Sequence, residues 1–226
     1  TASSLGLLGG KAAQNILIMG RRERGFNSTT VFQDVARYLD TTQNHLNAVS
    51  TGTTYYIVST NAADTSNGTG VRTVRVVSLN ASGVQVVSTV TLNGLTAVSL
   101  GAGISAVQWI EAATVGSGGV AAGDISIGSI NGAQTVASTI EMIAAGGSKS
   151  TSGRYVVPAG HIAYVYQWDI NAIGNDQDVR LRAQVFSDDH TFSEPFHFLD
   201  SMYRNGDQRG VQFCNYIKVT ALSMIK

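Results

Sequence analysis

The chain has 226 residues, with 15 basic and 15 acidic side chains and therefore no net charge. Charged residues make up 13% of it, against roughly 25% in an average globular domain. This composition argues against a basic nucleic-acid coat protein and against an acidic solvating chain. The single cysteine, Cys214, excludes an intramolecular disulfide and a multi-cysteine zinc site. No apolar run approaches the roughly 18–20 residues of a membrane-spanning helix.

The first fifty residues are organised differently from the rest and predict an arm followed by one helix. A small, glycine-rich apolar segment occupies residues 1–10. Thr30 and Gln33 then fit a capping box, in which each side chain satisfies a backbone N–H at the start of a helix. Val31, Val35 and Leu39 recur at helical spacing. We therefore predict a helix over residues 30–47.

The main electrostatic asymmetry is a set of basic residues in this N-terminal part. They could contact phosphates, but Glu23, Asp34 and Asp40 lie among them. Arginine is also common at protein interfaces, where its planar group pairs with carboxylates. We favour a contact with a protein partner over nucleic acid. The candidate contact residues are Lys11, Arg21, Arg22, Arg24 and Arg37.

From Tyr55 onward the apolar residues alternate with polar ones, as in half-buried strands. Residues 73–79 predict a strand, and Asn80 to Gly83 a turn with Gly83 at a positive φ. Residues 84–92 predict the returning strand, and Asn93-Gly94 a tight type I′ hairpin turn after it. Further strands are predicted at 104–115, 124–130, 136–143, 154–157, 161–172, 178–186, 194–199 and 211–225.

Many short strands joined by glycine-rich turns are typical of an antiparallel β-sandwich or jelly roll. Pro158 lacks the N–H that a strand ladder needs and therefore marks a strand boundary. The long aromatic run 161–168 predicts a central core strand. Because no linker is visible, we predict an N-terminal arm and helix over 1–50 and one jelly-roll-like β-sandwich domain over 51–226.

The stretch 51–160 is poor in charge. A soluble monomer usually carries scattered charges of both signs on its surface. So neutral a surface predicts that neighbouring subunits cover it, and hence an obligate oligomer or lattice subunit. The eight charged residues of this stretch are Asp64, Arg72, Arg75, Glu111, Asp124, Glu141, Lys149 and Arg154.

No catalytic pattern is visible, and we expect neither a catalytic residue, a metal nor a cofactor. No serine lies in a G-x-S-x-G nucleophile elbow, and Cys214 is interpreted as a small buried hydrophobe. Hydrolysis by Asp176 and Asp178 is the enzymatic alternative. The densest potential ligand set is interpreted as a solvated loop, with a structural calcium ion as the alternative. This set is Asp188, Asp189, His190, Glu194, His197 and Asp200.

Several short segments occur in an order that is similar to a known family. Residues 55–186 resemble a recurrent segment of virion structural proteins of tailed bacteriophages. The resemblance implies a place in the virion and no defined chemistry, and related capsid decoration and cement proteins are often β-sandwich trimers. The segments are Tyr56–Thr60, Ala63–Thr65, Gly68–Val76, Val90–Gly94, Gly123–Ile125, Val157–Gly160 and Val179–Arg182.

Together these patterns favour a non-enzymatic capsid decoration or cement subunit in the phage head. Its expected partners are copies of itself, most simply in a homotrimer, and the major capsid protein. Neither a membrane nor nucleic acid is expected as a partner. The alternative is a tail, baseplate or host-adhesion component, in which the Asp188–Asp200 loop meets a receptor or a glycan.

Overall fold

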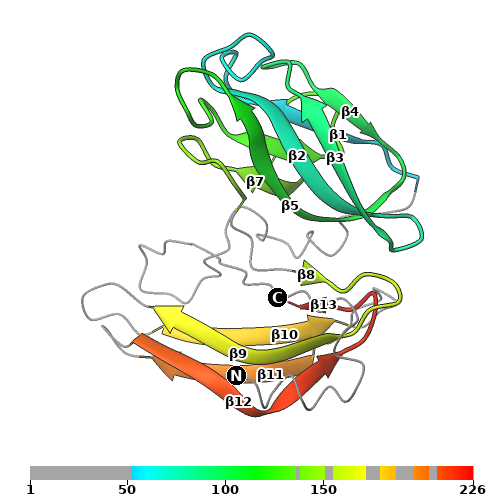
Figure 1. Cartoon of the computed structure of the whole chain (residues 1–226), viewed down its shortest axis with the longest axis vertical. Coiled ribbons are helices and arrows are strands. Elements are labelled where there is room, and N and C mark those ends of the chain that lie inside the picture. The colour runs from blue at the N-terminus through cyan, green and yellow to red at the C-terminus, as the bar shows by residue number, and fades with distance from the viewer. Residues whose placement is uncertain are drawn as a thin grey trace.

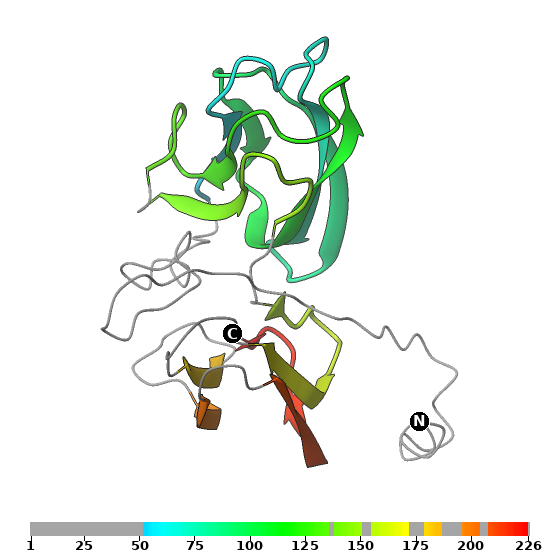
Figure 2. The ribbon, with the colours of Figure 1, turned by 90° about the vertical axis from the view of Figure 1, so that its left-hand side faces the viewer.

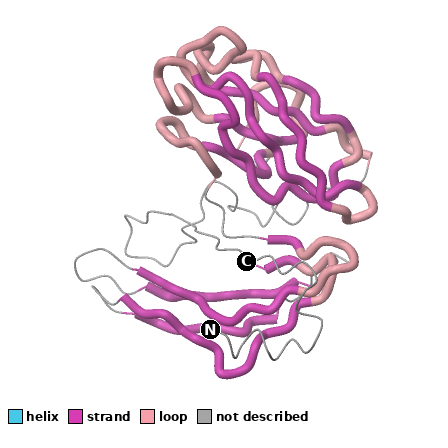
Figure 3. The backbone as a smooth tube through the Cα atoms, in the orientation of Figure 1, coloured by secondary structure: helices cyan, strands magenta, loops and turns pink. Residues whose placement is uncertain are grey.

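The computed structural model describes residues 52–135, 138–150, 155–171, 179–186, 196–203 and 208–225. Between residues 166 and 217 the description covers the backbone alone. The predicted N-terminal arm and the helix predicted over 30–47 lie outside the described residues. Those residues are strands and loops, as Figure 3 shows, and they contain no helix that is long and apolar enough to cross a membrane.

The fold is mainly β, and each strand pairing is antiparallel. Figures 1 and 2 show the strands in two groups, β1–β7 and β8–β13. The strands are β1 (Tyr55–Ser59), β2 (Val71–Asn80), β3 (Gln85–Thr91), β4 (Val98–Gly101), β5 (Ile104–Val115), β6 (Ile125–Gly128), β7 (Thr139–Ile143), β8 (Tyr155–Val156), β9 (Ala163–Asn171), β10 (Val179–Phe186), β11 (Phe196–Tyr203), β12 (Gln208–Val219) and β13 (Met224–Ile225).

The first group contains two sheets that bury one common set of side chains. Their strand orders are β4-β1-β6-β7 and β3-β2-β5. Ile57 of β1 and Ile127 of β6 belong to the same core cluster as Val74 of β2 and Ile110 of β5. These side chains are fully buried, and each such side chain contributes roughly 1.5–3 kcal/mol through its removal from water. The shared apolar core therefore holds the two sheets together.

The second group also contains two sheets, with the orders β11-β10-β13-β8 and β12-β9. It meets the first group through β8 and β13. Leu79 and Ala106 of the first group form a small buried cluster with Val156 and Met224 of the second. The side-chain amide of Gln108, fully buried, both donates to and accepts from the backbone of Val156. The Gln108 side chain thus makes the two hydrogen bonds to Val156 that the backbone of a neighbouring strand would otherwise make.

The structure confirms most of the predicted strands and the first turn. The strand predicted over 104–115 is β5, with the same bounds. Gly83 has a φ of 73° in the turn between β2 and β3, where the Asn80 side-chain oxygen accepts from the N–H groups of Ser82 and Val84. Pro158 lies two residues after the end of β8, as a strand boundary requires. The strand predicted over 211–225 is two strands, β12 and β13, separated by residues 220–223.

Two predictions are wrong. Asn93-Gly94 is not a type I′ turn, because only Gly94 of the pair has a positive φ. The tight turn lies one residue later, with Gly94 and Leu95 at its centre: Asn93 bridges Thr96, and the Thr96 N–H donates to the Asn93 oxygen over 3.0 Å. The next strand, β4, then pairs with β1 in the other sheet. The N–H of Gly94 instead donates to the backbone oxygen of Asp64. The run 161–168 is not a central strand either: β9 has β12 as its single neighbour among the described strands. The aromatic residues of this run predict a buried strand, and a strand can be buried by other layers while it has a single neighbour in its own sheet.

We expect Gly83→Ala to loosen the junction between the two groups of strands. A Cβ at Gly83 would overlap Cδ2 of Leu222, which would have to turn away, and would lie 3.2 Å from the Ala159 Cβ, in addition to the strain of the positive φ. The free energy of unfolding should fall by about 2–4 kcal/mol. Urea denaturation followed by circular dichroism measures this loss.

Gly101→Ala is the matched control. Gly101 has a φ of 83°, and a Cβ there would meet no atom within 4 Å. It should lose only about 1–2 kcal/mol, the cost of a left-handed backbone. Equal losses in the two variants would contradict the contact of Gly83 with Leu222 and Ala159.

Candidate interaction surface

The most exposed strand of the first group is β3, which forms one edge of the sheet β3-β2-β5. It pairs with β2 over seven residue pairs without a register shift. On its other side no hydrogen bond joins residues 85–91 to another part of the described chain. Six of its seven side chains are exposed. We call the open side of residues 84–91 the β3 edge (Figure 1).

The opposite edge of the same sheet is covered. Lys149 forms a bridge with Glu111 on the outer side of β5. The N–H of Ala112 donates to the Ser148 oxygen over 2.7 Å, and the N–H of Ser150 donates to the Ile110 oxygen over 2.9 Å. These bonds satisfy backbone groups that a bare edge would leave to water or to another chain. The sheet therefore has one closed edge and one open edge.

The β3 edge carries apolar side chains. Val84, Val86 and Val87 are 51, 42 and 57% exposed, and Leu95 in the following turn is 61% exposed. Single exposed apolar residues are ordinary, but an apolar strand edge with free backbone groups is a template for pairing with another strand. The first half of β3 thus presents both backbone hydrogen-bonding groups and apolar side chains to the outside.

The β3 edge also lies in a segment without charge. Residues 76–110 contain no Asp, Glu, Lys or Arg. Several charged groups outside this segment are engaged within the fold. Glu111 pairs with Arg75 over 2.9 Å and with Lys149 over 3.6 Å, and the Lys149 ammonium lies 5.5 Å from the centre of the Trp109 ring. Arg75 lies on β2, Glu111 lies on β5, and Lys149 lies in the segment that covers β5. None of the three charged groups lies on β3.

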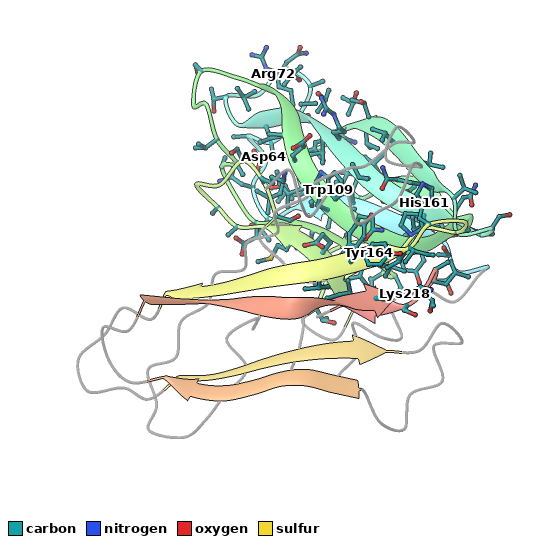
Figure 4. All side chains as sticks on the ribbon, turned by 60° about the horizontal axis from the view of Figure 1, so that its bottom comes forward. Asp64, Arg72, Trp109, His161, Tyr164 and Lys218 are labelled. Atoms are coloured by element: carbon teal, nitrogen blue, oxygen red, sulfur yellow. The ribbon has the colours of Figure 1, made fainter. Side chains whose placement is uncertain are left out.

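The fully buried carboxylate of Asp64 organises the loop to which the chain after β3 is bonded (Figure 4). Its Oδ1 accepts from the N–H groups of Val71 and Ala122, over 2.7 and 3.0 Å. Its Oδ2 accepts from the Ser59 hydroxyl over 2.6 Å and from the Gly123 N–H over 2.9 Å. The carboxylate therefore joins the end of β1, the start of β2 and the loop before β6. Four donors compensate the burial of its charge.

The backbone of the same residue fixes the chain that leaves β3. The Asp64 oxygen accepts from the Gly94 N–H over 2.8 Å, and Thr65 forms a bridge with Asn93. At the other end of β3, the Gly83 oxygen accepts from the Ala159 N–H over 2.8 Å. Both ends of the strand are thus anchored. The β3 edge is held in an extended shape before any partner arrives.

A second exposed apolar pair follows the loop that anchors Gly83. Ile162 and Tyr164 are 49 and 43% exposed, and Tyr164 is the register partner of Lys218 on β12. Figure 4 shows His161, Tyr164 and Lys218 gathered at one end of the β9–β12 pair, apart from Asp64. The exposed apolar side chains of the described residues therefore continue beyond β3 into the second group of strands.

The predicted contact residues lie elsewhere in the sequence. Lys11, Arg21, Arg22, Arg24 and Arg37 all lie outside the described residues, so their contact with a partner stays a prediction.

The potential ligand set is described only in part. Asp188, Asp189, His190 and Glu194 lie outside the described residues, as do Asp176 and Asp178. His197 and Asp200 lie on β11, where they are register partners of Gln184 and Arg182. Among the side chains that are described, no three metal-ligating residues come together. The calcium alternative stays a prediction.

Comparison of the chain with protein-family models, with curated proteins and with solved structures finds no match. The site is therefore interpreted from its own residues.

Two features of this surface escaped the sequence reasoning. The charge-free segment 76–110 can be seen in the sequence, but which of its strands forms an open edge cannot. The low charge of the stretch 51–160 suggests that Asp64 is one of a few surface charges, but this residue is fully buried. Its flanking Asn, Ser, Thr and Gly residues, which favour tight loops, are the only local signal of such a role.

We expect Asp64→Asn to destabilise the fold. An amide nitrogen in place of Oδ2 could donate to the Ser59 hydroxyl oxygen, but it would face the N–H of Gly123. Two donors would then oppose each other in a buried site, and the charge-assisted bonds would be lost. The free energy of unfolding should fall by about 2–4 kcal/mol, as measured by urea denaturation.

The control for this change is Asp124→Asn. Asp124 is partly exposed, and its Oδ1 accepts from the Ala145 N–H, a bond that the amide oxygen of Asn can retain. Its cost should stay within about 1 kcal/mol. A similar small cost at Asp64 would show that its carboxylate does not hold these loops together.

Proposed function

We propose that this chain is a non-enzymatic structural subunit of a tailed-phage virion, and specifically a capsid decoration or cement protein. The observation that carries the proposal is the neutral, apolar and unpaired β3 edge, held rigidly at both ends. Such a strand is suited to contact with another protein chain, since main-chain hydrogen bonds supply affinity and side chains supply fit. The sequence resemblance over residues 55–186 supplies the setting.

The proposed architecture is a β-sandwich of the jelly-roll kind. The common core of the sheets β4-β1-β6-β7 and β3-β2-β5 supports two facing layers. Sandwiches of this kind serve in many capsid and lectin domains, but the architecture alone does not assign a function. In this proposal the sandwich is a rigid spacer that carries its contact surfaces on its edges and ends.

The proposed partners are copies of the chain itself, in a homotrimer, and the major capsid protein. A surface with few free charges loses little hydration energy when neighbouring subunits cover it. The basic residues Lys11, Arg21, Arg22, Arg24 and Arg37 would contact carboxylates of the capsid protein. Repeated weak contacts of this kind gain strength in a symmetric shell, because bound neighbours raise the effective concentration at each site.

The test is the composition and stability of purified particles of the phage that encodes the chain. Quantitative mass spectrometry should find the chain in amounts comparable to the major capsid protein. Mild denaturant should release it, and the stripped heads should lose their DNA at a lower temperature. Adding back the purified chain should restore the original temperature.

Two outcomes would overturn the proposal. Absence of the chain from purified particles would exclude a virion role. A few copies per particle would exclude the decoration role and favour the tail, baseplate or adhesion alternative.

A further inference from the structure

We propose that the β3 edge pairs with the β3 edge of a second copy of this chain, antiparallel and across a two-fold axis near Val87. The pairing would join the sheets β3-β2-β5 of two copies into one continuous sheet. This inference deepens the proposed function, on which its biological setting rests.

Among the described residues, β3 lacks the features by which monomeric proteins protect an edge strand. Such edges carry lysines, prolines, bulges or a covering segment. Residues 84–91 contain no charge and no proline, and the β2–β3 register runs without a shift. The β2–β5 register, by contrast, shifts at several points, and residues 148–150 cover β5. Among the described residues, protection is thus present on the β5 side of the sheet and missing on the β3 side.

The absence of charge on β3 also favours a second copy of the same strand as its partner. A strand without charge has nothing to select a charged partner, whereas it meets its own sequence without like-charge repulsion. With the axis at Val87, Val86 lies opposite Ser88 of the second copy and Val84 lies opposite Val90. Gln85 lies opposite Thr89. Each of these cross-strand pairs joins neutral side chains, and Val87 meets Val87 of the second copy at the axis.

Antiparallel pairing of identical strands is self-complementary, so it closes on two copies and leaves no further β3 edge free. A homotrimer must use another surface, because a three-fold contact joins two different patches. The β3 pair and the trimer can therefore coexist. In a shell, the β3 pair would link each trimer to its neighbours.

The experiment uses like and opposite charges at the two-fold axis. Val87→Lys and Val87→Glu change a side chain that is 57% exposed, so the fold should tolerate both. Each variant alone should weaken the association of two copies about tenfold or more, because like charges then meet at the axis. Mixing the two variants in equal amounts should restore the association. Sedimentation equilibrium over a concentration series measures both effects.

Val120→Lys is the matched control. Val120 is also exposed, at 39%, but it lies in the loop between β5 and β6. This variant should associate like the parent chain. Far-ultraviolet circular dichroism checks that all variants keep their strands, and Thr89→Lys provides a second charge on β3 should either Val87 variant fail to fold.

A cysteine scan tests the register. Single cysteines at positions 85–89 are oxidised and compared with the parent chain, which contains Cys214 alone. Disulfide-linked dimers should form fastest for Val87→Cys and fall away on both sides of it. A cysteine at Ser117, an exposed loop residue, reports random collisions. Equal cross-linking at all these positions would contradict a fixed antiparallel pair.

The outcomes separate this inference from the proposed function. Association that is unchanged by charge on β3, or a parent chain that stays monomeric at all concentrations, would overturn the β3 pair. A mass that grows with concentration to the same extent in the parent chain and in the Val87 variants would indicate aggregation through other surfaces and would also overturn it. Particle binding is scored independently: a chain that decorates heads without β3 pairing keeps the function and loses the pair. A chain that pairs through β3 but is absent from particles supports the β3 pair and contradicts the proposed function.

Discussion

Each β-sheet ends in two edges, and the hydrogen-bonding groups along an edge must be paired, covered or left in water. In the sheet β3-β2-β5 the two edges are treated differently. Residues 148–150 cover β5, and the Gln108 amide pairs with the backbone of β8, while β3 keeps one side open. This asymmetry gives the molecule a direction in which it can add a further strand.

Hydrogen bonds fix the chain at both ends of the open β3 edge. The Asp64 carboxylate joins the end of β1, the start of β2 and the loop before β6, and its backbone oxygen bonds Gly94 after β3. The Gly83–Ala159 contact fixes the hairpin at the other end. A strand that is already extended loses little conformational freedom when a partner binds, so more of the interaction energy remains as affinity. The charged groups near the sheet are bonded within the fold. Asp64 accepts hydrogen bonds from four donors, and Glu111 forms ion pairs with Arg75 and Lys149.

Low charge has two consequences for such a molecule. It lets subunits pack closely without burying ions, and it removes the repulsion that keeps monomers apart in solution. An open neutral edge would therefore be a risk of aggregation in an isolated chain. A closed two-fold contact uses the edge and removes the risk at the same time. A structural subunit of a symmetric particle would benefit from both properties.

The sequence by itself determined the β class, most strand positions and the β2–β3 turn. Alternation of Val and Thr with polar residues is a local signal, and Asn80 and Gly83 specify their turn through neighbouring atoms. The charge-poor surface was equally visible, since composition does not depend on the fold.

The tertiary structure decided which strands became neighbours and which edge stayed open. A tight turn does follow Asn93, yet the Gly94 N–H is bonded to Asp64, 30 residues away in the chain, and the strand after the turn pairs with β1 and not with β3. The sequence alone suggests that Asp64 is a surface charge. Its burial depends on four hydrogen-bond donors, which come from separate segments of the chain. The open side of β3 likewise depends on where residues 148–150 lie. Such pairings join residues far apart in sequence, and a local pattern contains no record of them.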